Sequence, residues 1–183
     1  APNAEIQPLI GSKEGILHVT LAFVNPGEQV LVPNPGYPTY TSLSKILGAE
    51  VINYSLKEEN GWMPDFDELE KMDMSRVKLM WTNYPNMPTG ANATPELYRK
   101  LVDFARRKDI VIVNDNPYSF ILNEHPLSIL SVPGAKERCI GLAHRHARLQ
   151  CRLRPMDTES EEQHRQRHVP RHATGRRHCP RSR

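Results

Sequence analysis

The chain has 183 residues, of which 38% are hydrophobic and 25% are charged, a composition that argues against a disordered protein. Its apolar runs, such as residues 110–113, are too short to span a bilayer, and we expect neither a membrane segment nor a secretory signal. Three cysteines at irregular spacing argue against a disulfide framework and favour a reducing, cytoplasmic compartment.

Charge and aromatic content divide the chain in two. Residues 1–142 carry 13 Lys and Arg against 17 Asp and Glu, a net charge of −4. Residues 143–183 carry 11 Arg, no Lys and four acids, a net charge of +7, and contain six of the eight histidines but none of the twelve aromatic residues. We therefore predict one folded domain over 1–142. The segment 143–183 has no apolar period and is predicted to be a basic tail that does not pack.

Helices and strands are predicted to alternate along the first 142 residues. A helix over 12–24, starting at Gly11-Ser12, is rich in apolar residues and predicted to be buried on most sides. Short β-branched runs predict strands, and the segments between them predict helices, one of which begins at the cap pair Thr94-Pro95. The predicted strands cover 29–33, 50–54, 77–82, 110–113 and 138–142, and the remaining helices cover 40–47, 64–72 and 94–108.

This alternation predicts an α/β fold of three layers, with a mostly parallel sheet between helices. Turn-rich polar segments at 33–40, 83–90 and 114–118 follow three of the predicted strands. Ligands of such sheets bind outside the carboxyl ends of the strands, so these segments are predicted to meet at the ligand-binding edge.

Individual residues in these segments each have a functional and an ordinary reading. Gly11, Ser12 and Lys13 at a helix start could hold an anion, or could form a common helix cap beside a solvated lysine. Asp115, which follows an apolar strand, could pair with a cation or cap a turn. Tyr37 could stack on a flat ligand and Tyr118 could donate to one, or both could be ordinary turn and half-buried tyrosines.

Taken together, the segments are more specific. Gly-Ser-Lys-Glu-Gly over 11–15, Val-Pro-Asn-Pro-Gly-Tyr-Pro-Thr-Tyr over 32–40, Tyr-Pro-Asn-Met-Pro-Thr-Gly over 84–90 and Asn-Asp-Asn-Pro-Tyr over 114–118 occur in this order. The set resembles the class I/II aminotransferases, enzymes of fold type I that depend on pyridoxal 5'-phosphate (PLP). The resemblance covers about residues 3–142, the middle of the family's large, cofactor-binding domain.

The resemblance implies a role for seven residues of this chain. Gly11, Ser12 and Lys13 match the loop that holds the PLP phosphate, and Tyr37 matches the aromatic ring that stacks on the pyridine. Asp115 matches the aspartate paired with the pyridine nitrogen. Tyr118 matches the tyrosine that bonds to the phenolic oxygen. The family has an asparagine directly before Pro-Thr-Gly that also bonds to the phenolic oxygen, and this position is Met87 here. Asn86, one position earlier, is therefore the candidate for that contact.

The activity implied is transfer of an amino group between an amino acid and a 2-oxo acid, by a homodimer, with no metal and with no nucleic-acid or membrane partner. Another fold-type-I reaction, such as C–S lysis or decarboxylation, is the alternative within enzymes, because fold and cofactor do not determine the reaction. A non-catalytic PLP-binding or interaction fragment is the alternative of a different class.

One required residue is missing. A family member should show a Ser-x-Ser-Lys segment soon after the strand near Leu142, and its lysine forms the Schiff base with PLP and moves the substrate proton. No lysine follows Lys136. The resemblance also leads us to expect a second domain, with an arginine that binds the substrate carboxylate, and an N-terminal arm. Neither is found in this sequence. We therefore expect no catalytic residue and no turnover in this chain, and we interpret residues from about 142 onward as frameshifted or otherwise non-native.

Two functional interpretations of the tail compete with disorder. Its arginines could bind nucleic acid, but no stacking residues accompany them. His164, His168 and His172 have helical spacing, with Cys151 and Cys179 available, but Pro170 interrupts the helix and no paired Cys motif exists. A disordered basic tail is therefore the favoured interpretation.

Overall fold

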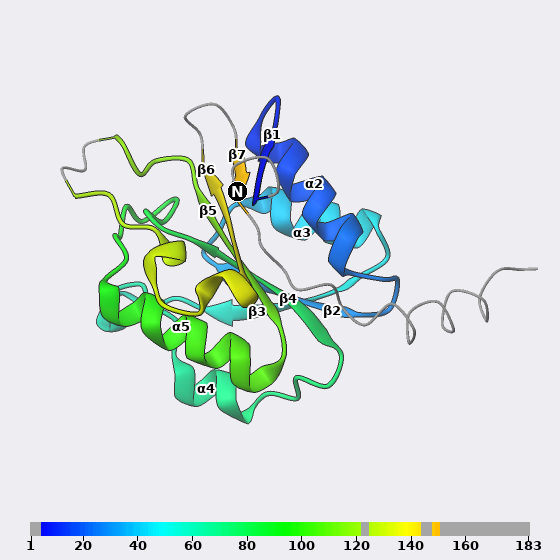
Figure 1. The fold of residues 1–183 in the computed structure, drawn as a ribbon. Helices are drawn as coiled ribbons and strands as arrows, with labels where there is room; N and C mark the ends of the chain where they lie inside the picture. The colour runs from blue at the N-terminus through cyan, green and yellow to red at the C-terminus, as the bar shows by residue number, and fades with distance from the viewer. Residues whose placement is uncertain (1–4, 122–124, 144–147, 151–183) are drawn as a thin grey trace, which may run out of the picture. The chain divides into compact units, whose positions relative to one another are not determined.

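The computed structural model describes residues 5–121, 125–143 and 148–150, all within one compact unit. Its centre is a sheet of seven strands in the order β1-β7-β6-β5-β4-β2-β3 (Figure 1). The strands are β1 (Ile6–Pro8), β2 (Gln29–Asn34), β3 (Glu50–Ser55), β4 (Val77–Asn83), β5 (Val111–Asn116), β6 (Cys139–Ala143) and β7 (Arg148–Gln150).

Five of these strands are parallel. β2 lies between β3 and β4, β4 pairs with β5, and β5 pairs with β6, all in parallel register. β7 runs antiparallel to both β6 and β1. The predicted α/β class and mostly parallel sheet are thus confirmed.

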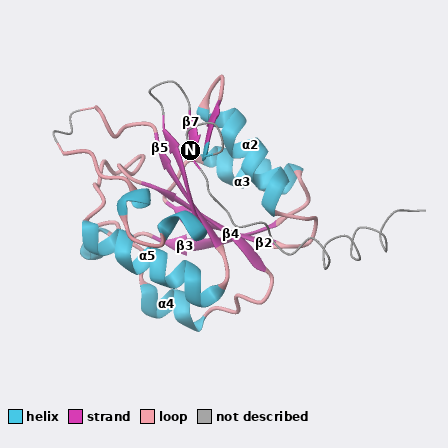
Figure 2. Cartoon of the chain, in the orientation of Figure 1, coloured by secondary structure: helices cyan, strands magenta, loops and turns pink. Residues whose placement is uncertain are grey.

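Helices cover both faces of the sheet (Figures 1 and 2). α2 (Ser12–Phe23) and α3 (Pro38–Ile46) lie on one face, and α4 (Phe66–Lys71) and α5 (Pro95–Lys108) lie on the other. Short 3-10 turns η2 (Ile129–Ser131) and η3 (Ala135–Glu137) add to the second side, and η1 (Glu58–Asn60) lies between β3 and α4 in the chain. The predicted three layers are therefore present.

Alternation along the strands divides the core into two clusters, because successive side chains of a strand point to opposite faces. In β5, Val111 and Val113 pack with Ile16 and Val19 of α2. Ile112, between them, packs on the other face with Phe104 of α5 and its neighbours. Each strand of the centre is apolar on both faces, as expected for a sheet covered on both sides.

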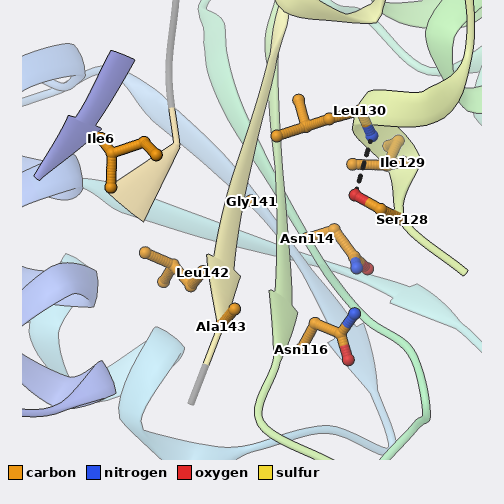
Figure 3. Close-up of a pocket in the computed structure, with 9 residues that line it drawn as sticks. All are labelled: Ile6, Asn114, Asn116, Ser128, Ile129, Leu130, Gly141, Leu142 and Ala143. Carbon is orange, nitrogen blue, oxygen red and sulfur yellow. Dashed lines mark hydrogen bonds between the residues drawn. The ribbon is translucent and has the colours of Figure 1, made fainter. Parts of the chain in front are cut away.

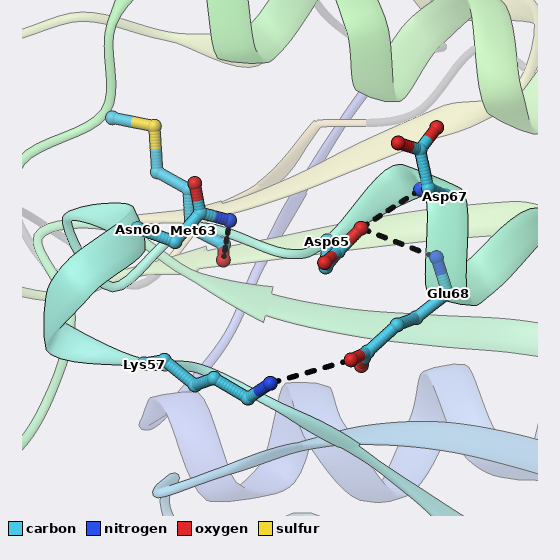
Figure 4. Close-up of polar contacts among 6 residues, drawn as sticks. All are labelled: Lys57, Asn60, Met63, Asp65, Asp67 and Glu68. Atoms are coloured by element: carbon cyan, nitrogen blue, oxygen red, sulfur yellow. Dashed lines mark hydrogen bonds and ion pairs between the residues drawn. The ribbon is translucent and has the colours of Figure 1, made fainter.

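Side-chain caps set the starts of the two helices on the second face. Thr94 Oγ1 accepts a hydrogen bond from the Leu97 amide at 3.0 Å, which confirms the predicted cap of α5. Asp65 Oδ1 accepts from the amides of Asp67 and Glu68 at 2.9 and 3.2 Å and so starts α4 (Figure 4). The acidic helix predicted over 64–72 is present but shorter, at Phe66–Lys71.

Two features differ from the predictions. Only one stripe of α2 is buried, and Leu21 is 56% exposed, so the expectation of burial on most sides is wrong. A single sheet face can cover only about a third of a helix surface.

Residues 148–150 form β7, which differs from the prediction that the segment from 143 onward does not pack. Backbone groups at a sheet edge can pair with any short extended segment, whatever its side-chain pattern. The rest of the predicted tail lies outside the described residues.

Candidate functional site

The polar segments follow neighbouring parallel strands, as predicted. β2 ends at Asn34, β4 at Asn83 and β5 at Asn116, and Asn83 stands opposite Asp115 in the register of β4 and β5. Parallel strands present their carboxyl ends at one edge of the sheet, so the three segments share that edge.

Asp115 is held near the end of β5 on the face covered by α2 and α3. Asp115 lies two and four residues after Val113 and Val111 in the strand, so its side chain points to the same face as theirs. It is only 3% exposed. Its Oδ2 accepts a hydrogen bond from the Tyr40 hydroxyl at 2.8 Å, and its backbone oxygen accepts one from Asn83 Nδ2 at 2.8 Å. A buried carboxylate held in this way is suited to pair with a cation.

Tyr40 is a site residue that the sequence reasoning missed. It is fully buried, stacks on Trp81 with ring centroids 4.8 Å apart and planes 7° from parallel, and bonds to Asp115. Burial raises the pKa of the Tyr40 hydroxyl well above its ordinary value, and the nearby Asp115 carboxylate and its hydrogen bond raise the pKa further. The available signal was its place in the same segment, since Tyr40 follows Tyr37 by three residues and stands in the first turn of the helix that Tyr37 precedes.

Tyr37 lies half-buried directly before α3 and packs against Tyr40 in a T-shaped arrangement, with ring centroids 5.6 Å apart. The turn before it is tight. A Cβ on Gly36 would lie 2.4 Å from the carbonyl oxygen of Pro33, so glycine is required there by close approach of the backbone. The structure thus brings the predicted residues Tyr37 and Asp115 together through Tyr40.

The start of α2 leaves room beside its free amides. Gly11 precedes the helix with extended backbone, at φ −167°, and no side chain of the described residues caps the first turn. A Cβ on Gly11 would have no atom of the described residues within 4 Å, so neither backbone conformation nor packing within the described structure requires glycine at this position. Ser12 is half-buried and Lys13 is exposed. A helix N-terminus with open space is suited to an anion such as phosphate.

The first turn of α2 lies above the strand next to Asp115. A Cβ on Gly15 would lie 3.0 Å from a methyl group of Leu142, and Leu142 pairs with Asp115 in the register of β5 and β6. The predicted phosphate loop and the predicted ring-nitrogen partner therefore occupy the same face of the sheet.

The remaining two predicted residues belong to the turns after β4 and β5. Asn86 is 2% exposed; its Oδ1 accepts from Thr89 Oγ1 at 2.8 Å, whereas its buried Nδ2 has no hydrogen-bond partner among the described residues. The Tyr118 hydroxyl lies 3.5 Å from Sδ of Met87, the residue that replaces the family's asparagine. Tyr118 as a whole is 38% exposed.

A cavity of about 160 Å³ also lies near the ends of β5 and β6 (Figure 3). Asn114 and Asn116 line it together with Ser128 and residues 129–130. Because Asp115 lies between these two asparagines in the strand, its side chain points to the opposite face. The cavity is therefore not the space into which the Asp115 carboxylate is directed.

In the described part of the chain, no helix is both long and apolar enough to cross a membrane. The same residues contain no group of three or more His, Cys, Asp or Glu that could hold a metal ion. The His and Cys residues weighed for zinc lie outside the described residues.

The chain belongs to the aminotransferase class I and II family, whose model matches residues 1–146. Members of this family depend on PLP. The chain is 49% identical over 141 residues to LL-diaminopimelate aminotransferase of Aquifex aeolicus and 43% identical over 138 residues to the enzyme of that name from Dehalococcoides mccartyi. These matches cover 76% and 74% of this chain but 36% of each relative, so the chain spans about a third of the relatives' length.

Solved structures agree in fold. A substrate-bound BacF structure from Bacillus subtilis superposes with a TM-score of 0.76 at 36% identity, over 82% of this chain and 41% of that one. A probable N-succinyldiaminopimelate aminotransferase from Thermus thermophilus also superposes with a TM-score of 0.76, at 28% identity, over 82% and 44%. These matches confirm the family and the fold type predicted from the four sequence segments.

Proposed function

We propose that the chain is the cofactor-binding segment of a PLP-dependent aminotransferase, which moves an amino group between an amino acid and a 2-oxo acid. The observation that carries the proposal is the buried Asp115 carboxylate, held by Tyr40 on the same sheet face as the open start of α2. The names of the relatives favour a diamino dicarboxylic acid of the diaminopimelate type as the amino donor.

The residues present fit PLP. Gly11, Ser12 and Lys13 would hold the phosphate at the first amides of α2, where no described residue fills the space next to Gly11. Tyr37 would cover the pyridine ring, and Asp115 would keep a proton on the ring nitrogen. When bound, the protonated ring supplies an electron sink for the carbon from which the substrate loses its proton.

Two further donors would meet the phenolic oxygen of PLP. Tyr118 is the first, because among the described residues its hydroxyl bonds to a thioether sulfur, which is a weak acceptor. Asn86 is the second, because its buried Nδ2 lacks a partner among the described residues, and a buried donor left unpaired costs about 1–3 kcal/mol. Supply of an acceptor by the cofactor would remove that cost.

We further propose that this 183-residue chain does not itself turn over substrate, since no lysine follows Lys136 in the sequence. The family match ends at residue 146, close to the change of composition near 142, which supports a frameshifted or non-native tail. The encoding DNA, translated in all three frames across codons 130 to 183, should then show the Ser-x-Ser-Lys segment. If no frame contains it, the chain is a PLP-binding module without a Schiff-base lysine.

The whole protein is proposed to be a cytoplasmic homodimer with small-molecule partners, and with neither nucleic acid nor membrane among them. Sedimentation of the full-length gene product tests the dimer. Amino transfer that depends on an added 2-oxo acid distinguishes an aminotransferase from a C–S lyase or a decarboxylase, which would instead release a sulfur compound or carbon dioxide.

Cofactor binding by the chain as it stands is tested with pyridoxamine 5'-phosphate, whose amine cannot react with surface lysines. Equilibrium dialysis should show saturable binding. Asp115→Asn should weaken it by about tenfold or more, because a charged hydrogen bond contributes about 1.5–3 kcal/mol. Asp103→Asn, on the exposed side of α5, is the matched control and should bind like the parent chain. Absence of saturable binding, or equal affinity of the two variants, would contradict the proposal.

A further inference from the structure

The contact between Tyr40 and Asp115 joins two distant parts of the chain inside the core. The residues are 75 positions apart, Tyr40 on α3 and Asp115 on β5, and their exposed fractions are 0% and 3%. The tyrosine hydroxyl has a single proton, and the 2.8 Å bond to Asp115 Oδ2 uses it. The family resemblance assigns no role to Tyr40, so this contact adds a residue to the candidate site.

We propose that Tyr40 is a positioning residue for Asp115, which orients the carboxylate and holds it in its ionised form for the pyridine nitrogen. The proposal rests on the proposed function and adds to it a residue that does not itself touch the cofactor. The physical reason is general: a hydrogen bond donated to a carboxylate favours the charged form. A charged Asp115 leaves the shared proton on the ring nitrogen, whereas a carboxylate deprived of this donor would take more of that proton.

The packing around Tyr40 fixes its hydroxyl in this direction. Trp81 stacks on one face of the Tyr40 ring with centroids 4.8 Å apart, and Tyr37 forms a T-shaped pair with that ring with centroids 5.6 Å apart. The Tyr40 backbone is held as well, since its amide donates to the Tyr37 carbonyl at 3.2 Å and its carbonyl accepts from Ser44 Oγ at 2.7 Å. A buried aromatic side chain with two rotatable bonds cannot turn away from Asp115 without displacing these rings.

The same environment keeps Tyr40 a donor. Desolvation in the core raises the pKa of the Tyr40 hydroxyl first of all, and the Asp115 charge raises that pKa further. The hydroxyl therefore remains protonated wherever the carboxylate is charged, and the pair cannot become two facing anions at ordinary pH.

Tyr54 offers a matched comparison. It is also buried, at 5% exposed, and its hydroxyl donates to the backbone oxygen of Trp81 at 2.7 Å. Both tyrosines thus contact Trp81, and both lose one buried hydrogen bond when replaced by phenylalanine. Of these two hydrogen bonds, only the one from Tyr40 has an acceptor, Asp115, that is proposed to contact the cofactor.

The experiment compares Tyr40→Phe with Tyr54→Phe in the 183-residue chain, with pyridoxamine 5'-phosphate labelled with ¹⁵N in the ring. Both variants should lower the melting temperature to a similar degree. Tyr40→Phe should also weaken binding about five- to tenfold and move the ring ¹⁵N resonance toward that of unprotonated pyridine. Tyr54→Phe should leave affinity within about twofold and the resonance unchanged.

The outcomes separate this inference from the proposed function. If the parent chain binds the probe but the two variants have the same affinity and the same ¹⁵N resonance, Tyr40 is structural and the inference is overturned. If the parent chain shows no saturable binding, the proposed function fails and the inference fails with it. A ¹⁵N change confined to Tyr40→Phe supports both.

Discussion

Replacement of Gly11 by alanine should separate folding from phosphate binding. The added methyl group meets no atom of the described residues within 4 Å, and the φ of −167° is open to any residue, so the described structure accommodates it. Alanine is a poorer helix cap than glycine by about 0.5–1 kcal/mol. Its restriction of the unfolded chain contributes about 0.4–1 kcal/mol in the opposite direction. The free energy of unfolding should therefore change by no more than about 0.5 kcal/mol.

Cofactor affinity should respond differently. If the phosphate lies at the free amides of α2, the methyl group of Gly11→Ala occupies space next to it. The Kd for pyridoxamine 5'-phosphate should rise about tenfold or more, which corresponds to about 1.4 kcal/mol. Equilibrium dialysis measures the affinity, and urea unfolding of the same variant measures stability.

Gly36→Ala provides the contrast. Its Cβ would lie 2.4 Å from the Pro33 carbonyl oxygen, a backbone atom that cannot rotate away, so this variant should lose about 1–3 kcal/mol of unfolding free energy. The reasoning would be refuted if Gly11→Ala bound the probe as tightly as the parent chain. It would equally be refuted if Gly11→Ala lost as much stability as Gly36→Ala.

Two other predictions concern stability alone. Thr94→Ala removes the side chain that accepts from the Leu97 amide and should cost about 1 kcal/mol in urea unfolding; a change below about 0.3 kcal/mol would show that the cap contributes little. Alkaline pH should destabilise the fold, because burial raises the pKa of Tyr40 and Tyr54 well above 10 and that of Cys139 from about 9 to about 12. These groups stay protonated in the folded state while the unfolded chain releases their protons. The contribution of these groups to stability is thus fully present below their pKa values in the unfolded chain. Above the unfolded-state pKa of each group, the free energy of unfolding falls by about 1.4 kcal/mol per pH unit. Urea midpoints at pH 7, 9 and 10.5 measure this, and a midpoint that does not fall above pH 9 would contradict it.

Local sequence predicted the parallel strands β2 to β6 and the helices α2 to α5, because the interactions that decide these elements are short-ranged, whereas β1 and the 3-10 turns were not predicted. The β-branched run over 29–33 and the cap pair Thr94-Pro95 predicted β2 and α5 to within a residue or two. The four polar segments were specific enough in residue type and order to predict the family and seven candidate site residues, since turns that approach a ligand tolerate few side chains.

Pairing and burial were decided only by the tertiary structure. Nothing in the sequence places β2 between β3 and β4, or joins β7 to β1 at the edge, because backbone groups of any strand can form such ladders. The exposed Leu21 shows that an apolar residue on a helix is buried only where a sheet face reaches it.

The environment of the candidate site also depended on the fold. The sequence by itself identified Asp115 and Tyr37 as residues of the right type, and it supplied Tyr40 three positions after Tyr37. That Tyr40 donates to Asp115 follows only once α3 packs on the face of β5 that carries this carboxylate. A contact between residues 75 positions apart is created by packing, whereas motifs and periodicity report neighbours along the chain.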